Sequence, residues 1–365
     1  MLALLSLLIW LYLFFGHGKF WQRAPELAPA VPSEWPDVDI IIPARDEAEH
    51  IGSVIASLLA QDYAGRFSIT LVDDNSVDGT AAAAGAAPNL LIIPGQPKPS
   101  GWSGKLWALS QGIAATKAPL LLFADADVRH DPRHLATLVA RLLQPRVEMV
   151  SEMVRLNCTS RAERFLVPAF VYFFQMLYPF AKVNDPLSRV AAAAGGTALI
   201  RRQALERVGG LEEFKNALID DVSLAKAVKR MGPIYLGHSQ LANSTRRYPA
   251  FADIWRMISR SAFTQLRYSA LLLLLTMLAL TLIFLVPAWE ALCGDGWGRV
   301  FGLAAFALAV ISFHPAQARY GQRKLFALAL PLIALFYMAA TLGSALNHWF
   351  GAGANWKNRA YGGGE

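Results

Sequence analysis

The chain has 365 residues, of which 55% are hydrophobic and 17% are charged. Average soluble domains carry about 25% charged residues, so this deficit argues against a wholly soluble protein and favours a membrane protein. The formal net charge of +7 fits a protein that meets an anionic membrane surface. Because the sequence also lacks nucleic-acid-binding motifs, we expect no nucleic-acid partner.

The amino-terminal residues 2–15 are almost wholly apolar, and residues 1–18 are predicted to form a transmembrane anchor. A signal peptide is the alternative, but no Lys or Arg precedes the apolar run, whereas Lys19 and Arg23 follow it. The positive-inside rule then places the following chain in the cytosol. Residues 19–36 are rich in proline and are predicted to form a tether.

Residues 37–249 are predicted to form an α/β domain with a Rossmann-like, mostly parallel sheet. Short apolar runs indicate buried strands, and apolar residues three and four positions apart indicate helices. The predicted strands are 38–42, 69–72, 90–93 and 120–123, and the predicted helices are 51–59, 105–115 and 134–143. Strands that alternate with helices imply βαβ units, which build a parallel sheet.

The segment 165–181 interrupts this domain with a run of mostly apolar and aromatic residues. A single membrane span at this point would place the two halves of the domain on opposite sides of the membrane. We therefore expect one or two helices that lie at the membrane interface. A buried core helix is the alternative.

The carboxyl-terminal third is predicted to be helical and membrane-bound. Residues 250–268 mix arginines with apolar side chains, which predicts a basic amphipathic helix on an anionic membrane surface; an ordinary exposed helix is the alternative. Residues 269–348 are predicted to hold three transmembrane helices, at 270–289, 300–313 and 325–346. Pro331 is expected to kink the last of these, and residues 349–365 form a tail. Basic residues between the last two spans place that loop in the cytosol, beside the α/β domain.

Two carboxylates follow the predicted strand 120–123. Asp125 and Asp127 are separated by one residue at the carboxyl end of this strand, where ligands bind in open α/β sheets. Two adjacent carboxylates repel each other unless a cation holds them. A hard divalent cation takes carboxylate oxygens and often keeps a substrate phosphate as a further ligand. The spacing therefore predicts a metal clamp for a nucleotide diphosphate, although the triplet alone fits a helix cap equally well.

Polar residues also follow the other strands. The second strand ends in Asp73 and Asp74, whose carboxylates can accept hydrogen bonds from a base or a ribose; a turn with a helix cap is the alternative. A glycine-flanked stretch ends at Lys105 just before a helix, which suits a phosphate, the alternative being a loop with a solvated lysine. Asp220 and Asp221 open a later helix. A carboxylate at a helix start is often only a cap, but one that faces the site can act as a general base.

Five of these motifs, in order over residues 38–231, resemble the inverting glycosyltransferases of family 2, which have the GT-A fold. They are Pro-Ala-Arg-Asp-Glu, Asp-Asp-Asn-Ser-x-Asp-Gly-Thr, Gly-Lys-x-x-Ala-Leu, Asp-Ala-Asp, and Asp-Asp before a helix. The membrane layout and the sequence Gly-Gly-Thr-Ala-Leu-Ile-Arg-Arg are similar to the ceramide-glucosyltransferase-like branch. Within that branch, the chain resembles the hopene-associated glycosyltransferases of bacteria.

The resemblance implies roles for particular residues in binding the donor. Asp73 or Asp74 would bind the uracil of a UDP-sugar, and Pro43 and Glu47 would line the nucleotide pocket. Lys105 would help to hold the base or the diphosphate.

The resemblance also implies a metal and a catalytic base. Asp125, itself a donor-binding residue, and Asp127 would hold Mg²⁺ or Mn²⁺ against the diphosphate. Asp221 would deprotonate the acceptor hydroxyl, with Asp220 beside it. The usual Glu-Asp pair is Asp-Asp in this chain, and the Gln-x-x-Arg-Trp motif is matched only by the imperfect echoes 246–248 and 265–268. The residue that closes on the diphosphate is therefore left unassigned.

The function that follows is transfer of a sugar from a nucleotide-sugar donor to the hydroxyl of a lipid acceptor, a hopanoid by resemblance, with inversion. The chain would be a multi-pass protein of the bacterial inner membrane with its catalytic domain in the cytosol. The alternatives are a polyprenyl-phosphate glycosyltransferase, a processive polysaccharide synthase and, outside the enzymes, a membrane scaffold.

Overall fold

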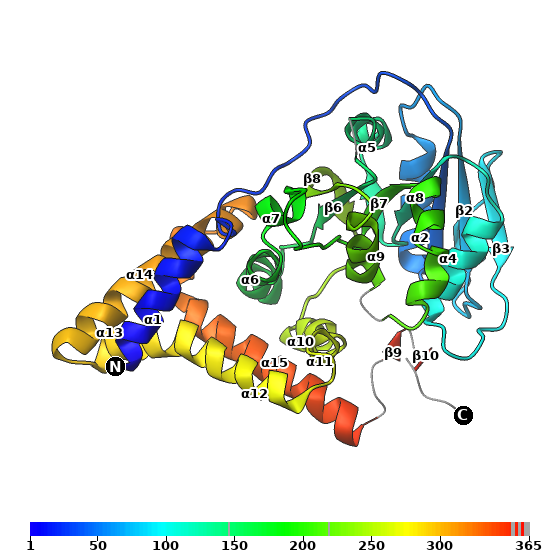
Figure 1. The fold of residues 1–365 in the computed structure, drawn as a ribbon. Coiled ribbons are helices and arrows are strands. Elements are labelled where there is room, and N and C mark those ends of the chain that lie inside the picture. Colours follow the sequence, from blue (N-terminus) through cyan, green and yellow to red (C-terminus); the bar gives the residue numbers. More distant parts are fainter. Residues whose placement is uncertain (145–146, 218–219, 352–354, 357–358, 361–365) are drawn as a thin grey trace. The chain divides into compact units, whose positions relative to one another are not determined.

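The computed structural model describes residues 1–144, 147–217, 220–351, 355–356 and 359–360, and the chain divides into two compact units. The helical unit comprises residues 1–24, 158–181 and 248–351. The sheet unit comprises residues 25–157 and 182–247, with the described residues beyond 354. Figure 1 shows the elements of both.

Among the described residues, eight strands of the sheet unit form one mixed sheet. In sheet order they are β3 (Leu90–Pro94), β2 (Phe67–Asp73), β1 (Val38–Ala44), β4 (Leu120–Ala124), β7 (Thr197–Arg201), β6 (Met149–Arg155), β8 (Ile234–Ser244) and β5 (Val128–His130). The first four strands are parallel to one another, and β6 is parallel to β8. The β4–β7, β7–β6 and β8–β5 pairs are antiparallel. The predicted α/β class with a mostly parallel sheet is confirmed.

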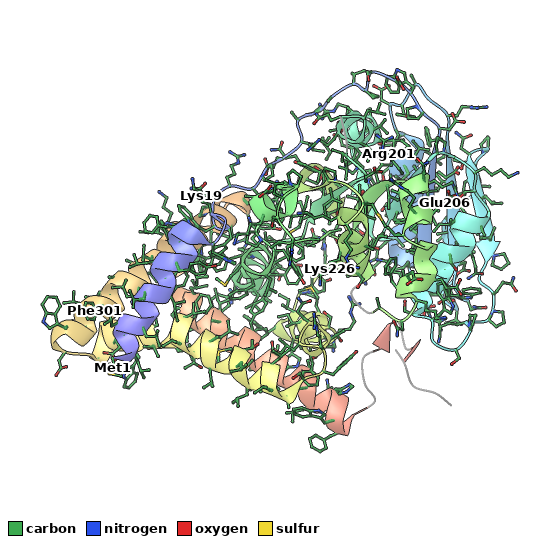
Figure 2. The ribbon with its side chains drawn as sticks, viewed as in Figure 1. Met1, Lys19, Arg201, Glu206, Lys226 and Phe301 are labelled. Atoms are coloured by element: carbon green, nitrogen blue, oxygen red, sulfur yellow. The ribbon has the colours of Figure 1, made fainter. Side chains whose placement is uncertain are left out.

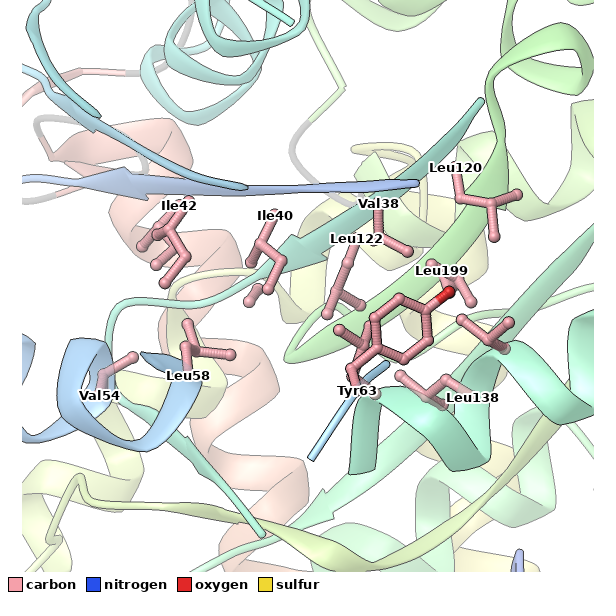
Figure 3. Close-up of a cluster of buried hydrophobic side chains, with 14 of the residues drawn as sticks. Val38, Ile40, Ile42, Val54, Leu58, Tyr63, Leu120, Leu122, Leu138 and Leu199 are labelled. Atoms are coloured by element: carbon pink, nitrogen blue, oxygen red, sulfur yellow. The ribbon is translucent and has the colours of Figure 1, made fainter. Parts of the chain in front are cut away.

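The core lies where the apolar runs predict it. Every residue of β1 and β4 is buried. Figure 3 shows alternate side chains of these strands packed against α2 (Ala48–Leu59) and α5 (His134–Leu142), including Ile40, Leu122 and Leu58. Because alternate strand residues point to opposite faces, Ile41 faces the other layer. There α4 (Gly104–Ala114) approaches so closely that a Cβ on Gly112 would lie 2.4 Å from Ile41 Cγ2.

The remaining helices connect these strands. They are α3 (Thr80–Ala83), α7 (Phe180–Asn184), α8 (Arg202–Arg207), the 3₁₀ helix η2 (Gly210–Phe214) and α9 (Asp220–Lys229). Two short strands, β9 (Asn355–Trp356) and β10 (Arg359–Ala360), pair in antiparallel orientation. Arg201, labelled in Figure 2, ends β7 at the edge opposite the strand-end carboxylates. Its guanidinium donates to the carbonyls of Leu142 (2.9 Å) and Val147 (3.1 Å). Leu142 is the last residue of α5, and its carbonyl has no partner within the helix, so Arg201 supplies the missing hydrogen bond.

The helical unit contains long apolar helices. Its elements are α1 (Leu2–Leu11), η1 (Tyr12–Gly16), α6 (Arg161–Leu177), α10 (Phe251–Ser259), α11 (Ala262–Gln265), α12 (Ala270–Leu280), η3 (Thr281–Leu285), α13 (Val286–Cys293), α14 (Gly296–Arg319), η4 (Lys324–Ala329) and α15 (Leu330–Phe350). Within the described residues, three continuous helices are long and apolar enough to cross a membrane: Ala270–Cys293, Gly296–Arg319 and Lys324–Phe350. Figure 2 labels Phe301 on the second of them.

The amino-terminal helix is shorter than these three. The helix Leu2–Gly16 has 15 residues, which at 1.5 Å per residue is about 22 Å, against a hydrocarbon core of about 30 Å. Its role as a transmembrane anchor stays a prediction.

Two details of the spans refine the expectation. The apolar run 300–313 is only the central part of α14. The helix extends beyond it in both directions, to Gly296 and to Arg319, and a turn follows at Gly321, where φ is +64°. Pro331 stands in the first turn of α15, just after the 3₁₀ helix η4, and a kink in this span stays a prediction. A proline in the first turn removes no hydrogen bond of α15 itself.

The segment 165–181 forms most of α6, which packs against α14, α15 and α10 within the helical unit. Leu166, Val167 and Tyr172 are at most 1% exposed, so much of the apolar surface of this helix faces protein. The helix α10 is amphipathic, with Ile254 and Ile258 buried. Contact of either helix with a membrane surface stays a prediction.

Candidate active site

The carboxyl ends of β1, β2 and β4 carry most of the predicted acidic residues. Because these strands are parallel and adjacent, Glu47, Asp74 and Asp125 follow their strands at one edge of the sheet. The edge is tied together by the backbone, since the Asp74 N–H donates to the Ala44 carbonyl at 2.8 Å. In the same way the Asp125 N–H donates to the Gly196 carbonyl (3.2 Å), which joins the end of β4 to the start of β7.

A first constellation surrounds Asp127. Arg246 bridges two carboxylates: its Nε lies 2.6 Å from Asp127 Oδ2, and one Nη lies 2.6 Å from Glu47 Oε1. The Arg246 side chain is 30% exposed, whereas the Asp127 and Glu47 side chains are 16% and 9% exposed. Both the N–H and the hydroxyl of Thr245 donate to the Asp127 carbonyl, at 2.7 Å and 2.9 Å. Residues 245–246 therefore hold Asp127 through its backbone and its side chain.

A second constellation lines one cavity. Lys105 Nζ lies 2.8 Å from Asp125 Oδ1, and Lys105, Asp125 and Asp221 are its charged lining residues. The rest of the lining is largely apolar and includes Pro43, Leu106, Leu109, Phe123, Ala198, Phe214 and Leu224. A Cβ on Gly195 would lie 3.2 Å from Asp221 Oδ2 and 3.4 Å from Lys105 Nζ. A larger residue at this position would therefore press on both charged groups, and the Asp221 carboxylate would have to shift by a few tenths of an ångström.

The local sequence explains how the charged residues of this cavity are placed. Ser103 caps α4 by accepting a hydrogen bond from the Leu106 N–H (3.3 Å), so Lys105 stands in the first turn. Asp221 stands in the first turn of α9, and its Oδ1 accepts the Val222 N–H at 2.8 Å. Asp220 begins the same helix, and its side chain lies outside the described part of the structure.

A third group follows β2. The side chain of Asp74 is fully buried, and Arg45 donates to its carbonyl at 2.6 Å while lying 3.8 Å from its Oδ2. Asp73 Oδ1 accepts the Ser76 N–H at 3.1 Å, which closes the turn after the strand. The structure thus gives each of these carboxylates a partner in the protein. Their donor-binding roles stay predictions.

The Asp-Gly-Thr part of the second motif positions Glu47. Asp78 accepts hydrogen bonds from the N–H and hydroxyl of Thr80 and from the Ala48 N–H (2.9 Å). Slight burial raises the pKa of Asp78, but these hydrogen bonds outweigh it, so the pKa lies below its ordinary value. The Thr80 hydroxyl in turn accepts the Glu47 N–H at 2.8 Å. Asp78 and Thr80 therefore fix the start of α2 and, through it, Glu47.

A buried polar cluster of the sheet unit includes two histidines. The Nδ1 atoms of His130 and His134 lie 2.8 Å apart, and His134 Nε2 lies 2.9 Å from Glu152 Oε2. Ser239 donates to the same Glu152 oxygen at 2.9 Å. Burial, with a smaller contribution from His134, holds the pKa of His130 well below its ordinary range. We interpret this cluster as structural.

The carboxylates at the end of β4 fit a divalent cation. Within the described residues, no group of three or more His, Cys, Asp or Glu side chains could hold a metal on its own. Mg²⁺ commonly binds one or two carboxylates and completes its shell with water and substrate phosphates. Asp125 and Asp127 offer that donor set, and a separate cation, Lys105 or Arg246, pairs with each. The oxygens are therefore placed for binding positive charge.

Sequence reasoning missed three residues of this edge. The sequence patterns include Arg246 only in the imperfect echo of Gln-x-x-Arg-Trp at 246–248, and they assign no binding or catalytic role to Arg45 or Gly195. The available signal for Arg246 is its place just after a strand, since a basic residue at a strand end complements acidic residues at neighbouring ends. The glycine pair at 195–196, next to a buried strand, marks a close approach.

The fold has a counterpart among solved structures. The mannosyltransferase PcManGT from Pyrobaculum calidifontis, in complex with GDP-Man and Mn²⁺, matches with a TM-score of 0.58 at 21% sequence identity. The match covers 96% of this chain and 99% of that chain. At this identity it establishes the fold, and it confirms the GT-A architecture that the motifs predict.

Curated relatives match part of the chain. It is 28% identical over 219 residues to a beta-monoglucosyldiacylglycerol synthase of Synechocystis sp., covering 56% of this chain and 43% of the relative. It is 31% identical over 98 residues to a 4,4'-diaponeurosporenoate glycosyltransferase of Staphylococcus haemolyticus, covering 27% of this chain and 26% of the relative. The matched region spans less than half the length of these relatives. The family model for glycosyl transferase family 21 matches residues 1–362, almost the whole sequence. The chain therefore belongs to glycosyl transferase family 21.

Proposed function

We propose that the chain is a membrane-bound glycosyltransferase that moves a sugar from a nucleotide-sugar donor to a lipid hydroxyl with inversion. The observation that carries the proposal is the cavity in which Lys105, Asp125 and Asp221 meet at the carboxyl ends of the sheet. A cationic side chain, a carboxylate suited to a metal and a carboxylate suited to a base are the groups that such a displacement needs.

The residues have separate tasks in one step. Asp221 accepts the proton of the acceptor hydroxyl while that oxygen forms a bond to the anomeric carbon of the sugar. The bond from the anomeric carbon to the diphosphate oxygen breaks, and the nucleoside diphosphate leaves with the electron pair. Lys105 stabilises the charge that builds on the leaving group. A divalent cation held by Asp125 and Asp127 supplies the same stabilisation as a Lewis acid when bound.

We assign the remaining predicted residues to the nucleotide. Asp73 or Asp74 binds the base, which we take to be uracil, and Pro43 and Glu47 flank the nucleotide. Pro43 lines the cavity beside the charged trio, which supports this placement. Asp220, at the start of α9, is assigned to the acceptor side with Asp221.

A lipid acceptor is supported by the family and by the helices. The names of the relatives describe glycosylation of a diacylglycerol lipid and of diaponeurosporenoate. Three helices long enough to cross a membrane would hold the chain beside such an acceptor. We propose a hopanoid as the acceptor and the inner membrane of a bacterium as the location, with the sheet unit in the cytosol.

The test is incubation of membranes from cells that express the chain with a panel of radiolabelled nucleotide sugars, followed by lipid extraction. We expect label in a lipid only when the chain is present, and no label with the Asp125→Asn variant. Acceptors added in parallel are a hydroxylated hopanoid, diacylglycerol and polyprenyl phosphate. Absence of labelled lipid with every sugar, at normal expression and folding, would contradict the proposal.

The same experiment separates the alternatives. A polyprenyl-phosphate acceptor is already an anion and needs no base, so its transfer rate would survive Asp221→Asn. A polysaccharide synthase would place the label in material that does not extract into organic solvent. A scaffold would bind no nucleotide at all.

A further inference from the structure

Arg246 contacts Asp127, a carboxylate that the proposed function assigns to the metal. Its guanidinium contacts Asp127 Oδ2 through Nε and Glu47 Oε1 through an Nη atom, each at 2.6 Å. Thr245, the residue before it, holds the backbone of Asp127 with two hydrogen bonds. The segment 245–246 is thus a latch on one of the two candidate metal ligands.

A metal on Asp127 would compete with this contact. Oδ2 accepts a hydrogen bond from the guanidinium, and a divalent cation on the same carboxylate would stand a few ångströms from a like charge, which weakens the ion pair. Glu47 offers the guanidinium a second carboxylate, whose side chain is 9% exposed. The Glu47 backbone N–H donates to the Thr80 hydroxyl at 2.8 Å, which fixes the position of this residue. Arg246 can therefore leave Asp127 and remain anchored.

The guanidinium is also suited to the incoming ligand. Its planar set of N–H donors matches a phosphate as well as a carboxylate. The candidate ligand Asp125 shows the same arrangement, since Lys105 pairs with it from α4. Cations from two different elements thus pair with the two carboxylates that would hold the metal.

We propose that Arg246 holds Asp127 in place while the metal is absent and turns to the nucleotide diphosphate when metal and nucleotide bind, with Glu47 retaining it in both states. This inference rests on the proposed function for its ligand, a nucleoside diphosphate with Mg²⁺ or Mn²⁺. It assigns the cation that closes on the diphosphate to the end of β8.

The experiment measures metal and nucleotide binding separately on the full chain in detergent or nanodiscs. Binding of Mn²⁺ alone is followed by the electron paramagnetic resonance signal of free Mn²⁺. Binding of UDP, and of GDP, is measured by calorimetry at saturating Mn²⁺. The variants are Arg246→Gln and, as a matched control, Arg247→Gln, which removes the same charge from the exposed neighbouring residue.

The proposal predicts opposite changes for the two ligands in Arg246→Gln. Mn²⁺ alone should bind about three- to tenfold more tightly, because its competitor for Asp127 is gone. The diphosphate should bind about tenfold or more weakly at saturating Mn²⁺, because a charge-assisted hydrogen bond is lost. Arg247→Gln should change both affinities less than twofold.

Weaker binding of both ligands by Arg246→Gln would mean that the latch is only structural, and it would overturn the inference. Equal effects of Arg246→Gln and Arg247→Gln would also overturn it, because they would reflect general electrostatics. If Arg246→Gln does not fold, Arg246→Lys keeps the charge without the planar fork and should show the same opposite changes at smaller size. A wild-type chain that binds neither Mn²⁺ nor nucleotide would instead count against the proposed function.

Discussion

Asp221→Asn separates chemistry from binding more cleanly than other substitutions in the cavity. The amide of asparagine has nearly the same shape as the carboxylate, and its oxygen can still accept the Val222 N–H that Asp221 Oδ1 accepts at 2.8 Å. The ion pair of Lys105 and Asp125, at 2.8 Å, involves neither oxygen of Asp221. The substitution therefore removes a proton acceptor and one charge while α9 keeps its start.

The size of the effect follows from these contacts. Loss of a general base lowers a rate by about 10² to 10⁴-fold, or about 3 to 5 kcal/mol in the activation barrier. The nucleotide should bind within about fivefold of the wild-type affinity, because the substitution keeps both Lys105 and Asp125 and because partly exposed charges contribute little. We therefore expect kcat to fall and the Kd of the nucleoside diphosphate to stay nearly constant.

The assay measures transfer of a labelled sugar to a lipid hydroxyl at saturating donor, together with calorimetric binding of the nucleoside diphosphate. The matched control is Asp62→Asn, which makes the same change at an exposed position of the sheet unit and should leave both quantities unchanged. A turnover of Asp221→Asn within threefold of wild type would show that another group takes the proton. A parallel loss of nucleotide binding would show that Asp221 serves the donor instead.

Further predictions concern the metal, the glycine and the buried histidines. Asp125→Asn should weaken Mn²⁺-dependent nucleotide binding about tenfold or more, and wild-type binding that persists in a chelator would contradict the metal role. Gly195→Ala should lower transfer at least tenfold while thermal stability changes little, because its Cβ would stand 3.2 Å from Asp221 Oδ2; normal transfer would show that the cavity relaxes. The pKa of His130 in the folded state lies below its unfolded value of about 6.5, so the unfolded state binds the proton first as the pH falls. Below a pH of about 6.5 the free energy of unfolding should therefore fall by about 1.4 kcal/mol per pH unit. Thermal unfolding at pH 7.5 and 5.5 checks this, and an unchanged pH dependence in His130→Asn would refute it.

The strand-end carboxylates could be predicted because local patterns determine them. The apolar runs of β1, β2 and β4 identify buried parallel strands, and the residues after such strands necessarily share one edge. Asp125 and Asp127 could be placed by this reasoning alone. The helices α2, α4 and α5 followed from their apolar spacing to within a few residues.

Arg246 could not be placed from the sequence because its position depends on a distant strand pairing. β8 lies more than 100 residues after β5, and the antiparallel register that sets Ser244 opposite Val128 brings Arg246 to Asp127. Local patterns do not specify such a register. The two roles of Gly-Gly-Thr-Ala-Leu-Ile-Arg-Arg were equally hidden. Gly195 lines the cavity, whereas Arg201 donates to backbone carbonyls at the opposite edge of the sheet.

The measurement that decides whether this edge of the sheet holds an activated sugar is a structure of the full chain with Mn²⁺ and a nucleoside diphosphate. We expect the anomalous signal of Mn²⁺ within coordinating distance, about 2.1 Å, of an oxygen of Asp125 or Asp127. We also expect the diphosphate between that ion and the cavity of Lys105 and Asp221. A metal and diphosphate bound elsewhere, with both strand-end carboxylates still paired to Lys105 and Arg246, would contradict the proposed site.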